Sequence, residues 1–345
     1  MANRPFESKC SSSARPELSG EARRLIRPAS TNVRRTRALV AVAALVPALS
    51  GCNSGSGGQP TRFLSIGTGG TGGIYYPLGG AIAGMLSSTD THLTVTAEVS
   101  GGAVENLNRI AAGEIDIGFT IGTTLLQTTR DAARYGNVRV LAPLYPSVLH
   151  VLVGRSFAAT SVSDFAGRRV SVGAAGSGTE QAARDLLEAH GLDYDDIDER
   201  FLSFSESASA LRDGAIDAAI FVVGYPAAAV LEATTAAGVK LLGLEPERLR
   251  ELSDRHPHYG HGALPAGAYP GVENDLAAAT VMNWLVGRSD LDDATVEALL
   301  NALLDRRDEL IRVNPIASQI DLDALRRAPL PLHTASERWL GARTP

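Results

Sequence analysis

Three glycine-rich segments hold most of the residues that could bind a ligand in this chain. Gly67–Gly73 reads GTGGTGG, Ser100–Gly102 reads SGG, and Gly173–Thr179 reads GAAGSGT. Glycine lets a ligand come close to the backbone, and a loop that opens a helix offers free N–H groups to an anion. The segments therefore predict a site that binds a small anion through the backbone.

The first segment also matches the fingerprint of dinucleotide-binding proteins. Gly67, Gly69 and Gly72 have the spacing GxGxxG after a predicted strand, and Glu98 lies where a ribose-binding acid would sit. The additional glycines, the bulky residues 75–77 and the export signal described below weigh against this interpretation. A nicotinamide-dependent enzyme remains the weaker alternative.

Other residues typical of catalysis stand in unsuitable surroundings. A phosphate-binding P-loop needs Gly-Lys-Ser/Thr, but Lys240 is the only lysine after residue 51 and lies elsewhere. Ser177 is not part of the Gly-x-Ser-x-Gly motif of hydrolases. We therefore expect no enzymatic activity and no cofactor.

Two polar clusters are predicted to be solvated rather than to bind a metal ion. His256, His258 and His261 lie within six residues and could form a zinc site, but their proline and glycine neighbours favour a solvated loop. The acidic run 193–198 lacks the spacing of a calcium-binding EF-hand loop. We expect no bound metal.

Residues 1–51 are predicted to be an N-terminal extension with a lipoprotein signal peptide. Three arginines between positions 34 and 37 precede Ala38–Leu49, an apolar run too short to span a bilayer but typical of a signal peptide. The run ends in LSGC, so Cys52 is expected to carry a lipid, and residues 52–60 are expected to be a flexible tether. An ordinary cleaved signal peptide stays open.

Charge and cysteine content narrow the possible partners. The formal net charge is −6, and the predicted leader holds nine of the 32 basic and three of the 38 acidic residues. The remaining chain therefore has a formal net charge of −12, which argues against a nucleic-acid partner. Apart from Cys10 and Cys52 the sequence has no cysteine, so the mature domain has no disulfide and no thiol chemistry.

The rest of the chain is predicted to contain the same series of elements in each half. The series is strand, glycine loop, helix, strand, serine turn, helix, glycine, strand. Similar tetrapeptides, GEID at Gly113–Asp116 and GAID at Gly214–Asp217, occupy the same place in each half. We interpret the halves as related α/β lobes, although generic α/β units would share this order. The strands are predicted at 63–66, 93–99, 115–119, 169–172, 200–204 and 216–222.

Alternating strands and helices predict parallel sheets, in which ligands bind at the carboxyl ends of the strands. Two facing lobes would direct as many as four helix N-termini into one cleft, which favours an anion. The apolar stretch 140–153 is expected to form strands through a hinge. The predicted division is residues 61–145 for the first part of lobe 1, 146–245 for lobe 2, and 246–345 for the return to lobe 1.

Two longer segments carry a family resemblance: Gly67–Gly80 reads GTGGTGGIYYPLGG, and Ser100–Leu107 reads SGGAVENL. With these segments the chain resembles the TAXI family, the substrate-binding proteins of tripartite ATP-independent periplasmic (TRAP) transporters. Shorter matches follow in the family's order, at Leu144–Pro146, Asp164–Val170, Gly176–Thr179, Asp213–Asp217, Gly224–Pro226 and Pro331–His333. The resemblance implies an α/β, bilobal, periplasmic-binding-protein-like (type II) fold, with two lobes joined by hinge strands.

The resemblance also implies a function and a set of ligand-binding residues. The lobes would close on a small carboxylate, such as glutamate, glutamine or 2-oxoglutarate, and deliver it to a TRAP-type membrane permease. The implied residues are Thr68, Gly69, Gly72, Gly73, Ile74, Tyr75, Tyr76, Ser100, Gly101, Thr120, Ser177, Gly178, Thr179, Gly224 and Tyr225. One of the two adjacent tyrosines is expected to pack within the helix instead.

Two features bear on whether an amino group is recognised. Thr120–Thr124 reads TIGTT where many family members carry a polar or acidic residue, which favours a carboxylate without an amino group. Glu105 and Glu180 are either ammonium partners or acids that complement a helix dipole. The expected protein is a monomeric, extracytoplasmic receptor anchored to the membrane by a lipid, with a sensory ligand-binding module as the alternative.

Overall fold

The computed structural model describes residues 61–343 except residues 91 and 237. The chain divides into a unit of residues 1–56 and a unit of residues 57–345, and the described residues all belong to the second unit. The predicted signal peptide, the lipidation site Cys52 and the tether 52–60 lie outside the described residues. Within the described part of the chain, the helices are all too short or too polar to cross a bilayer.

The first lobe begins with a parallel three-stranded arrangement. Strand β1 pairs with β2 on one side and β3 on the other, both in the parallel direction. The elements are β1 (Arg62–Gly67), α1 (Tyr75–Thr89), β2 (Leu93–Glu98), α2 (Ala103–Ala112), β3 (Ile117–Ile121), α3 (Gly122–Thr128) and α4 (Ala132–Tyr135). The parallel pairing confirms the predicted α/β class.

The second lobe repeats this plan, with β5 pairing in parallel with β6 and β7. Its elements are β5 (Arg169–Ser171), α5 (Gly178–Ala189), β6 (Asp198–Arg200), α6 (Phe204–Asp213), β7 (Ala218–Val223), α7 (Ala228–Thr235), β8 (Lys240–Leu242), α8 (Pro246–Arg255) and β9 (Gly260–Leu264). The predicted strand 200–204 is wrong. The Ser203 hydroxyl accepts the Glu206 N–H and the Glu206 carboxylate accepts the Ser203 N–H, and this capping box begins α6.

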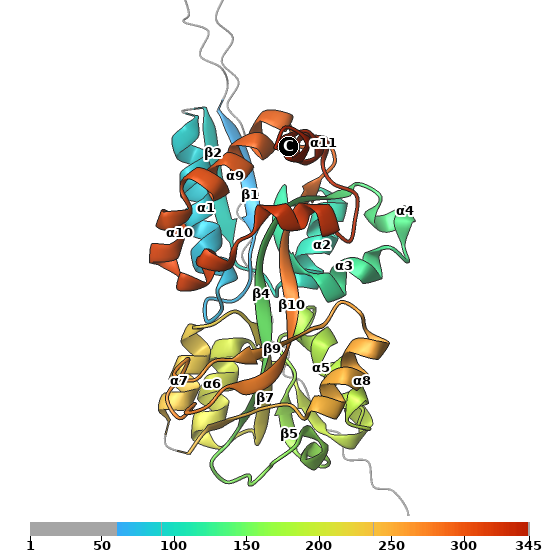
Figure 1. Ribbon diagram of the computed structural model, residues 1–345, viewed down its shortest axis with the longest axis vertical. Coiled ribbons are helices and arrows are strands. Elements are labelled where there is room, and N and C mark those ends of the chain that lie inside the picture. The colour runs from blue at the N-terminus through green and yellow to red at the C-terminus, as the bar shows by residue number, and fades with distance from the viewer. Residues whose placement is uncertain (1–60, 91, 237, 344–345) are drawn as a thin grey trace, which may run out of the picture. The chain divides into compact units, whose positions relative to one another are not determined.

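Two long antiparallel strands, β4 (Val138–Val153) and β10 (Leu276–Arg288), run through both lobes (Figure 1). At one end β10 pairs with β3 of lobe 1, and at the other β4 pairs with β7 of lobe 2. The strand order is therefore continuous, β2-β1-β3-β10-β4-β7-β5-β6. The apolar stretch expected to form the hinge is buried along nearly all of β4.

The chain returns to lobe 1 later than residue 246. Helix α8 packs on α5, and β9 pairs with β10, so residues 246–264 lie with the second lobe. The return is made along β10, and three helices follow it: α9 (Asp293–Asp305), α10 (Arg307–Val313) and α11 (Thr334–Gly341). Arg306 separates α9 from α10, because it is the C-cap residue of α9 and the N-cap residue of α10.

The repeated tetrapeptides form the same local structure in each lobe. Gly113 and Gly214 end α2 and α6 in the left-handed conformation, with φ of 77° and 71°. Three residues later, Asp116 accepts the N–H of Ser65 in β1 at 2.9 Å, and Asp217 accepts the N–H of Arg169 in β5 at 2.9 Å. Each aspartate thus links the turn that follows a helix to the first strand of its lobe, as two related lobes would require.

The Asp217 contact makes folding stability depend on pH. Hydrogen bonds from the Arg169 guanidinium, at 3.0 and 2.8 Å, hold the pKa of Asp217 below its ordinary value. A carboxylate whose pKa is lower in the folded than in the unfolded state stabilises the fold when the pH is above the unfolded-state pKa of about 4. This stabilisation is lost as the pH falls through the folded-state pKa. Asp217→Asn should lower the free energy of unfolding at pH 7 by about 0.5–1.5 kcal/mol, because solvent partly screens the pair.

Urea unfolding at pH 7, 5 and 3 checks this prediction. The difference between wild type and Asp217→Asn should shrink at pH 3, whereas the exposed Asp213→Asn control should differ little from wild type at any pH. A difference that stays constant down to pH 3 would contradict the assignment.

A second prediction concerns Asn106, a fully buried residue of α2. Its amide donates to the carbonyls of Thr68 and Phe119 at 2.7 and 2.9 Å, and its oxygen accepts the Ser100 hydroxyl at 2.7 Å. Asn106→Leu would leave these buried groups without partners, so the free energy of unfolding should fall by at least about 2 kcal/mol. Asn108→Leu is the matched control, because that amide oxygen only accepts the Tyr135 hydroxyl. Equal losses for the two variants in urea unfolding would refute this role.

Candidate functional site

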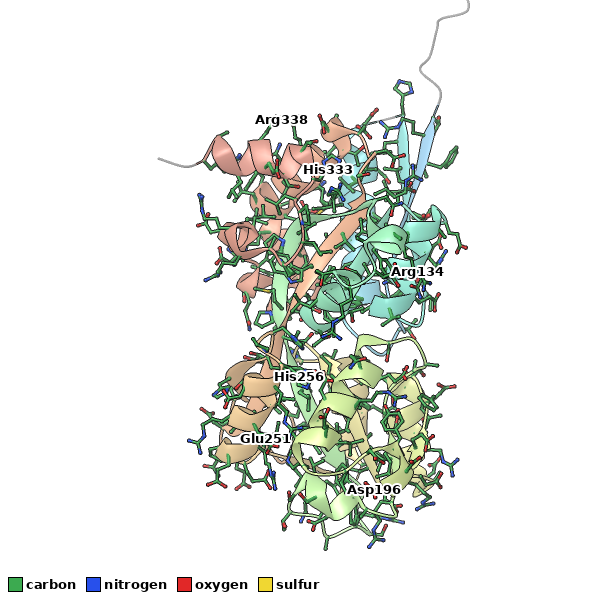
Figure 2. All side chains as sticks on the ribbon, turned by 90° about the vertical axis from the view of Figure 1, so that its right-hand side faces the viewer. Arg134, Asp196, Glu251, His256, His333 and Arg338 are labelled. Carbon is green, nitrogen blue, oxygen red and sulfur yellow. The ribbon has the colours of Figure 1, made fainter. Side chains whose placement is uncertain are left out.

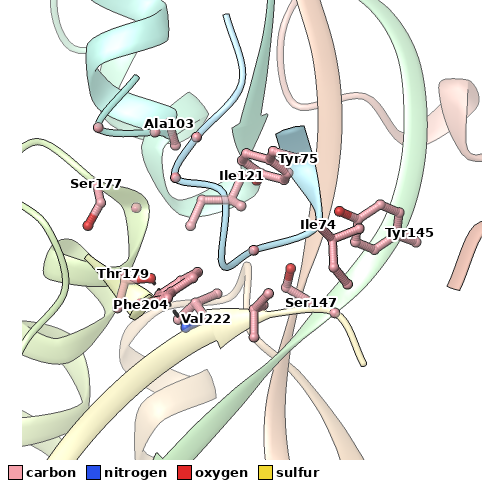
Figure 3. A pocket seen from close by; sticks show the side chains of 18 residues that line it. Ile74, Tyr75, Ala103, Ile121, Tyr145, Ser147, Ser177, Thr179, Phe204 and Val222 are labelled. Atoms are coloured by element: carbon pink, nitrogen blue, oxygen red, sulfur yellow. Dashed lines mark hydrogen bonds between the residues drawn. The ribbon is translucent and has the colours of Figure 1, made fainter. Parts of the chain in front are cut away.

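A cavity lies where the glycine-rich loops of the two lobes meet beside the crossing strands (Figure 3). Its volume is about 60 Å³, which exceeds the roughly 10–15 Å³ that a cavity needs to hold one water molecule. Eighteen residues line it: Gly69, Gly70, Gly73, Ile74, Tyr75, Gly101, Gly102, Ala103, Ile121, Tyr145, Ser147, Ser177, Gly178, Thr179, Phe204, Val222, Val223 and Gly224. The lining comes from both lobes and from the hinge strands.

Four helices begin at this cavity, as the sequence predicted. The N-cap residues are Ile74 of α1, Gly102 of α2, Ser177 of α5 and Ser203 of α6. The first-turn N–H groups of a helix have no partner within that helix, and the dipole adds partial positive charge there. The Ser177 hydroxyl accepts one of them, the N–H of Glu180, at 3.1 Å. The four helix ends therefore contribute partial positive charge next to the cavity.

The lining contains no charged side chain. The two acids that could have paired with an ammonium group are occupied nearby: the Glu105 carboxylate accepts the Gly101 N–H at 2.8 Å, and the Glu180 carboxylate accepts the Gly176 N–H at 3.0 Å. Both act as acceptors for the loops before their helices. Consequently neither a fixed cation nor a free carboxylate faces the ligand space.

The Tyr145 hydroxyl is the most informative polar group in the cavity. Tyr145 is fully buried, and its hydroxyl has no hydrogen-bond partner within the described residues. Burial raises the pKa of this hydroxyl well above its usual range, and the neighbouring Tyr75 raises it further, so it stays protonated. A buried hydroxyl without a partner costs free energy unless a ligand or water completes it.

A hydrogen-bond network holds the tyrosine end of the cavity in place. The Tyr75 hydroxyl donates to the side-chain oxygen of Asn283 in β10. The Asn283 amide donates to the Tyr145 carbonyl at 2.6 Å and to the Ser147 hydroxyl at 2.8 Å. Because Ser147 accepts this bond, its own proton is available to a ligand. Figure 3 shows the Tyr145 and Ser147 hydroxyls near each other, away from Ser177 and Thr179.

Nine of the predicted residues line the cavity, and the structure places the other six outside this lining. The nine are Gly69, Gly73, Ile74, Tyr75, Gly101, Ser177, Gly178, Thr179 and Gly224. The ring of Tyr75 packs on Phe119 with centroids 4.8 Å apart and forms a wall, while Tyr76 is 38% exposed on the outside. Thr179 also supports β7, because its hydroxyl accepts the Val222 N–H at 3.2 Å.

The remaining predicted residues serve the surrounding framework. Thr68 donates its hydroxyl to the Glu98 carbonyl at 2.6 Å, and Ser100 lines a second hollow of similar volume next to the cavity. Gly72 faces lobe 2, Thr120 is fully buried, and Tyr225 packs against the core.

Sequence patterns did not single out several lining residues. Tyr145 and Ser147 lie within the apolar hinge stretch, where a tyrosine is most simply interpreted as core. Ala103, Ile121, Phe204 and Val222 are ordinary apolar residues, and only their placement makes them walls. Phe204 is fixed by stacking on Phe221, with ring centroids 4.7 Å apart.

The lobes contact each other directly around the cavity. The Glu105 N–H of lobe 1 donates to the Gly176 carbonyl at 3.2 Å, and the Ala229 N–H of lobe 2 donates to the Gly72 carbonyl at 3.1 Å. Glycine makes these contacts possible, because a Cβ on Gly72 would lie 2.4 Å from the Ser205 hydroxyl oxygen. The structure therefore has its lobes closed.

The closed cleft offers no room for a dinucleotide. Gly72 of the GxGxxG pattern is covered by Ser205 and Ala229, and the Glu98 carboxylate pairs with Arg109 instead of facing a ribose.

Comparison with known proteins identifies one family and several distant structures. The model of the NMT1-like family matches residues 66–341. The alkanesulfonate-binding protein SsuA from Xanthomonas axonopodis pv. citri, bound to MOPS, is 17% identical, with 84% of this chain and 86% of that chain covered and a TM-score of 0.47. A putative L-cystine ABC transporter protein from Listeria monocytogenes is 15% identical, with 76% and 99% covered and a TM-score of 0.47. The family assignment rests on the family match alone.

Gly178 gives a direct test of how the lobes close. An added Cβ would lie 2.4 Å from Ile121 Cδ1 and 3.2 Å from Ala103 Cβ, both in lobe 1. Gly178→Ala should therefore hold the lobes further apart and increase the radius of gyration measured by small-angle X-ray scattering. Gly80→Ala is the control, because a Cβ there meets nothing within 4 Å. An unchanged radius for Gly178→Ala would show that the closed contacts do not form in solution.

Proposed function

This chain belongs to the NMT1-like family, and we propose that it is a solute-binding protein that works outside the cytoplasm. The observation that carries the proposal is the cavity between the lobes. It joins four helix N-termini with a buried tyrosine hydroxyl that has no partner in the described chain. Such a site can bind and hold a small molecule, but its lining contains no histidine, cysteine or carboxylate for general acid–base or nucleophilic catalysis.

The chemistry of the lining favours a small carboxylate without an amino group. Helix N-termini and hydroxyl donors complement negative charge, and the nearby carboxylates of Glu105 and Glu180 are already bonded to backbone N–H groups. An ammonium group in the cavity would therefore lack an acidic partner. On this ground a 2-oxo acid or a dicarboxylate such as 2-oxoglutarate fits better than glutamate or glutamine.

Binding would proceed by closure of the lobes around the ligand. Strands β4 and β10 connect the lobes and provide the hinge, and the closed cavity excludes bulk water. Hydrogen bonds to a charged ligand are strongest where water is excluded, so closure supplies affinity as well as access control.

The same proposal includes a membrane partner and an anchor. The motifs GTGGTGGIYYPLGG and SGGAVENL support a TRAP-type permease as the partner that receives the ligand, and the LSGC sequence supports a lipid on Cys52. An ABC permease or a sensor kinase is the alternative partner. A gene for one of these membrane proteins next to this gene would discriminate among them.

A binding screen tests the proposed function. The purified chain would be titrated calorimetrically with 2-oxo acids, dicarboxylates, amino acids, an alkanesulfonate and NAD. Saturable binding of a 2-oxo acid or dicarboxylate is the expected result. Preference for amino acids or alkanesulfonates would overturn the ligand class, and binding of NAD alone would overturn the receptor assignment.

The Tyr145 hydroxyl gives the sharpest variant for the same titration. Tyr145→Phe removes a hydrogen bond to the ligand but none within the described protein, so affinity should fall roughly 2- to 10-fold while the unfolding midpoint stays or rises. Tyr135→Phe is the control, because that hydroxyl donates to Asn108 away from the cavity. Unchanged affinity in Tyr145→Phe would remove Tyr145 from the binding site.

A further inference from the structure

A second cluster of chemically capable side chains lies outside the cavity, on lobe 2. Asp185 comes from α5, and His256 and His258 come from the segment between α8 and β9. One ligand atom from each residue, a carboxylate oxygen or a ring nitrogen, lies within 4.8 Å of the other two. Figure 2 shows His256 on lobe 2, close to the level at which the lobes meet.

The two histidines have buried nitrogens with no assigned role. The Nε2 atoms of His256 and His258 are buried and have no hydrogen-bond partner within the described residues. His256 Nε2 lies 3.8 Å from Asp185 Oδ1, which exceeds hydrogen-bond distance. Two ring nitrogens and a carboxylate thus face one another without bonding.

The carboxylate of Asp185 is buried, and within the described part of the chain it forms no ion pair with an arginine or lysine. The residue is 6% exposed, and its partners are the Gln181 amide at 3.0 Å and the Tyr259 hydroxyl at 2.8 Å. A buried carboxylate of this kind is stabilised by a bound cation.

From this geometry we propose that Asp185, His256 and His258 bind a zinc ion. Two imidazole nitrogens and one carboxylate oxygen form a donor set that suits zinc, whereas calcium and magnesium prefer oxygen ligands alone. The hydrogen bonds from Gln181 and Tyr259 orient the carboxylate, as outer-shell partners do in metal sites. His261 is not a ligand, because its Nε2 atom already contacts the Ser253 hydroxyl at 2.8 Å.

The ligand atoms need only a small adjustment to bind the ion. Zinc holds nitrogen and oxygen at about 2.0–2.2 Å, so the ligand atoms around a tetrahedral ion lie about 3.3–3.6 Å apart. The present separations, up to 4.8 Å, close to this value through side-chain rotations and small shifts of the loop that carries both histidines.

Asp185, His256 and His258 all line a groove of about 350 Å³. This groove is lined on the opposite side by residues at and after α3 of lobe 1, including Thr123 and Arg130. Water or a small anion can therefore complete the coordination. The ion would fix the histidine loop to α5 at the edge of the interlobe contact, without taking part in the cavity.

The test measures zinc binding by the untagged purified chain. After removal of metal with a chelator, Zn²⁺ is titrated calorimetrically, and the metal retained after gel filtration is counted. One Zn²⁺ per chain is expected for wild type. His258→Ala and Asp185→Asn should weaken binding by at least the roughly 10- to 100-fold typical of losing a group in the outer shell. His261→Ala is the matched control and should bind as wild type does.

Two further measurements show whether a loss of zinc binding in a variant comes from misfolding. Circular dichroism and thermal unfolding of each metal-free variant check that it folds. In Asp185→Asn the amide oxygen can still accept a bond from Gln181, and the amide NH2 can donate to the Tyr259 hydroxyl oxygen. Co²⁺ in place of zinc should give the visible absorption of a four-coordinate ion in wild type and His261→Ala only. Absence of binding in wild type, or equal binding in wild type and folded His258→Ala, would overturn the proposal. Neither result depends on which organic ligand the cavity takes.

Discussion

The close approach of the two lobes determines how small the cavity is, how well it excludes water and which helix N-termini meet in it. At two points the approach leaves no space for a Cβ, at Gly72 against Ser205 and at Gly178 against Ile121, and a Cβ on Gly101 would lie only 3.1 Å from the Ala175 carbonyl oxygen. Glycine at these positions lets helix N-termini from both lobes meet within one small space. A side chain there would open the cavity to water and weaken each N–H group as a donor to an anion. The glycines thus serve the closed state more than they serve loop flexibility.

The absence of a fixed cation in the lining affects how binding is linked to closure. An arginine in the cleft would attract an anion into the open protein and hold it with one lobe. The partial charges of helix N-termini act only over about the first turn, so the ligand gains most when both lobes surround it. When the ligand needs contacts from both lobes, it binds the closed state more tightly than the open state. The difference between these two binding free energies sets how far the ligand shifts the protein toward the closed state. Such a site suits a protein that must report or deliver its ligand by changing shape.

The sequence predicted the helices, strands and loops around the cavity better than the residues that line it. Glycine loops, helix stops and the GEID/GAID repeat are local signals, because each depends on the backbone conformation of a few neighbouring residues. Tyr145 carried no such signal, since a tyrosine in an apolar strand looks like core until the surroundings of its hydroxyl are known. The predicted strand 200–204 depended on apolar residues, but the capping box at Ser203 begins a helix there. The histidine segment was interpreted as a solvated loop because Asp185, more than seventy residues away, comes close only through the packing of α8 on α5. The spacing of residues within a short segment does not show which distant residues pack against that segment.

Asn283 connects the binding residues to the hinge and explains why they must act together. It lies in β10, one of the two crossing strands, and is fully buried. Its side chain joins Tyr75 at the start of α1 to Tyr145 and Ser147 of β4, so one amide fixes three residues of the lining. A ligand that pulls on the Tyr145 or Ser147 hydroxyl therefore acts on both crossing strands. Because a buried amide with all its hydrogen bonds made resists partial rearrangement, the hinge and this wall of the cavity should move as one unit.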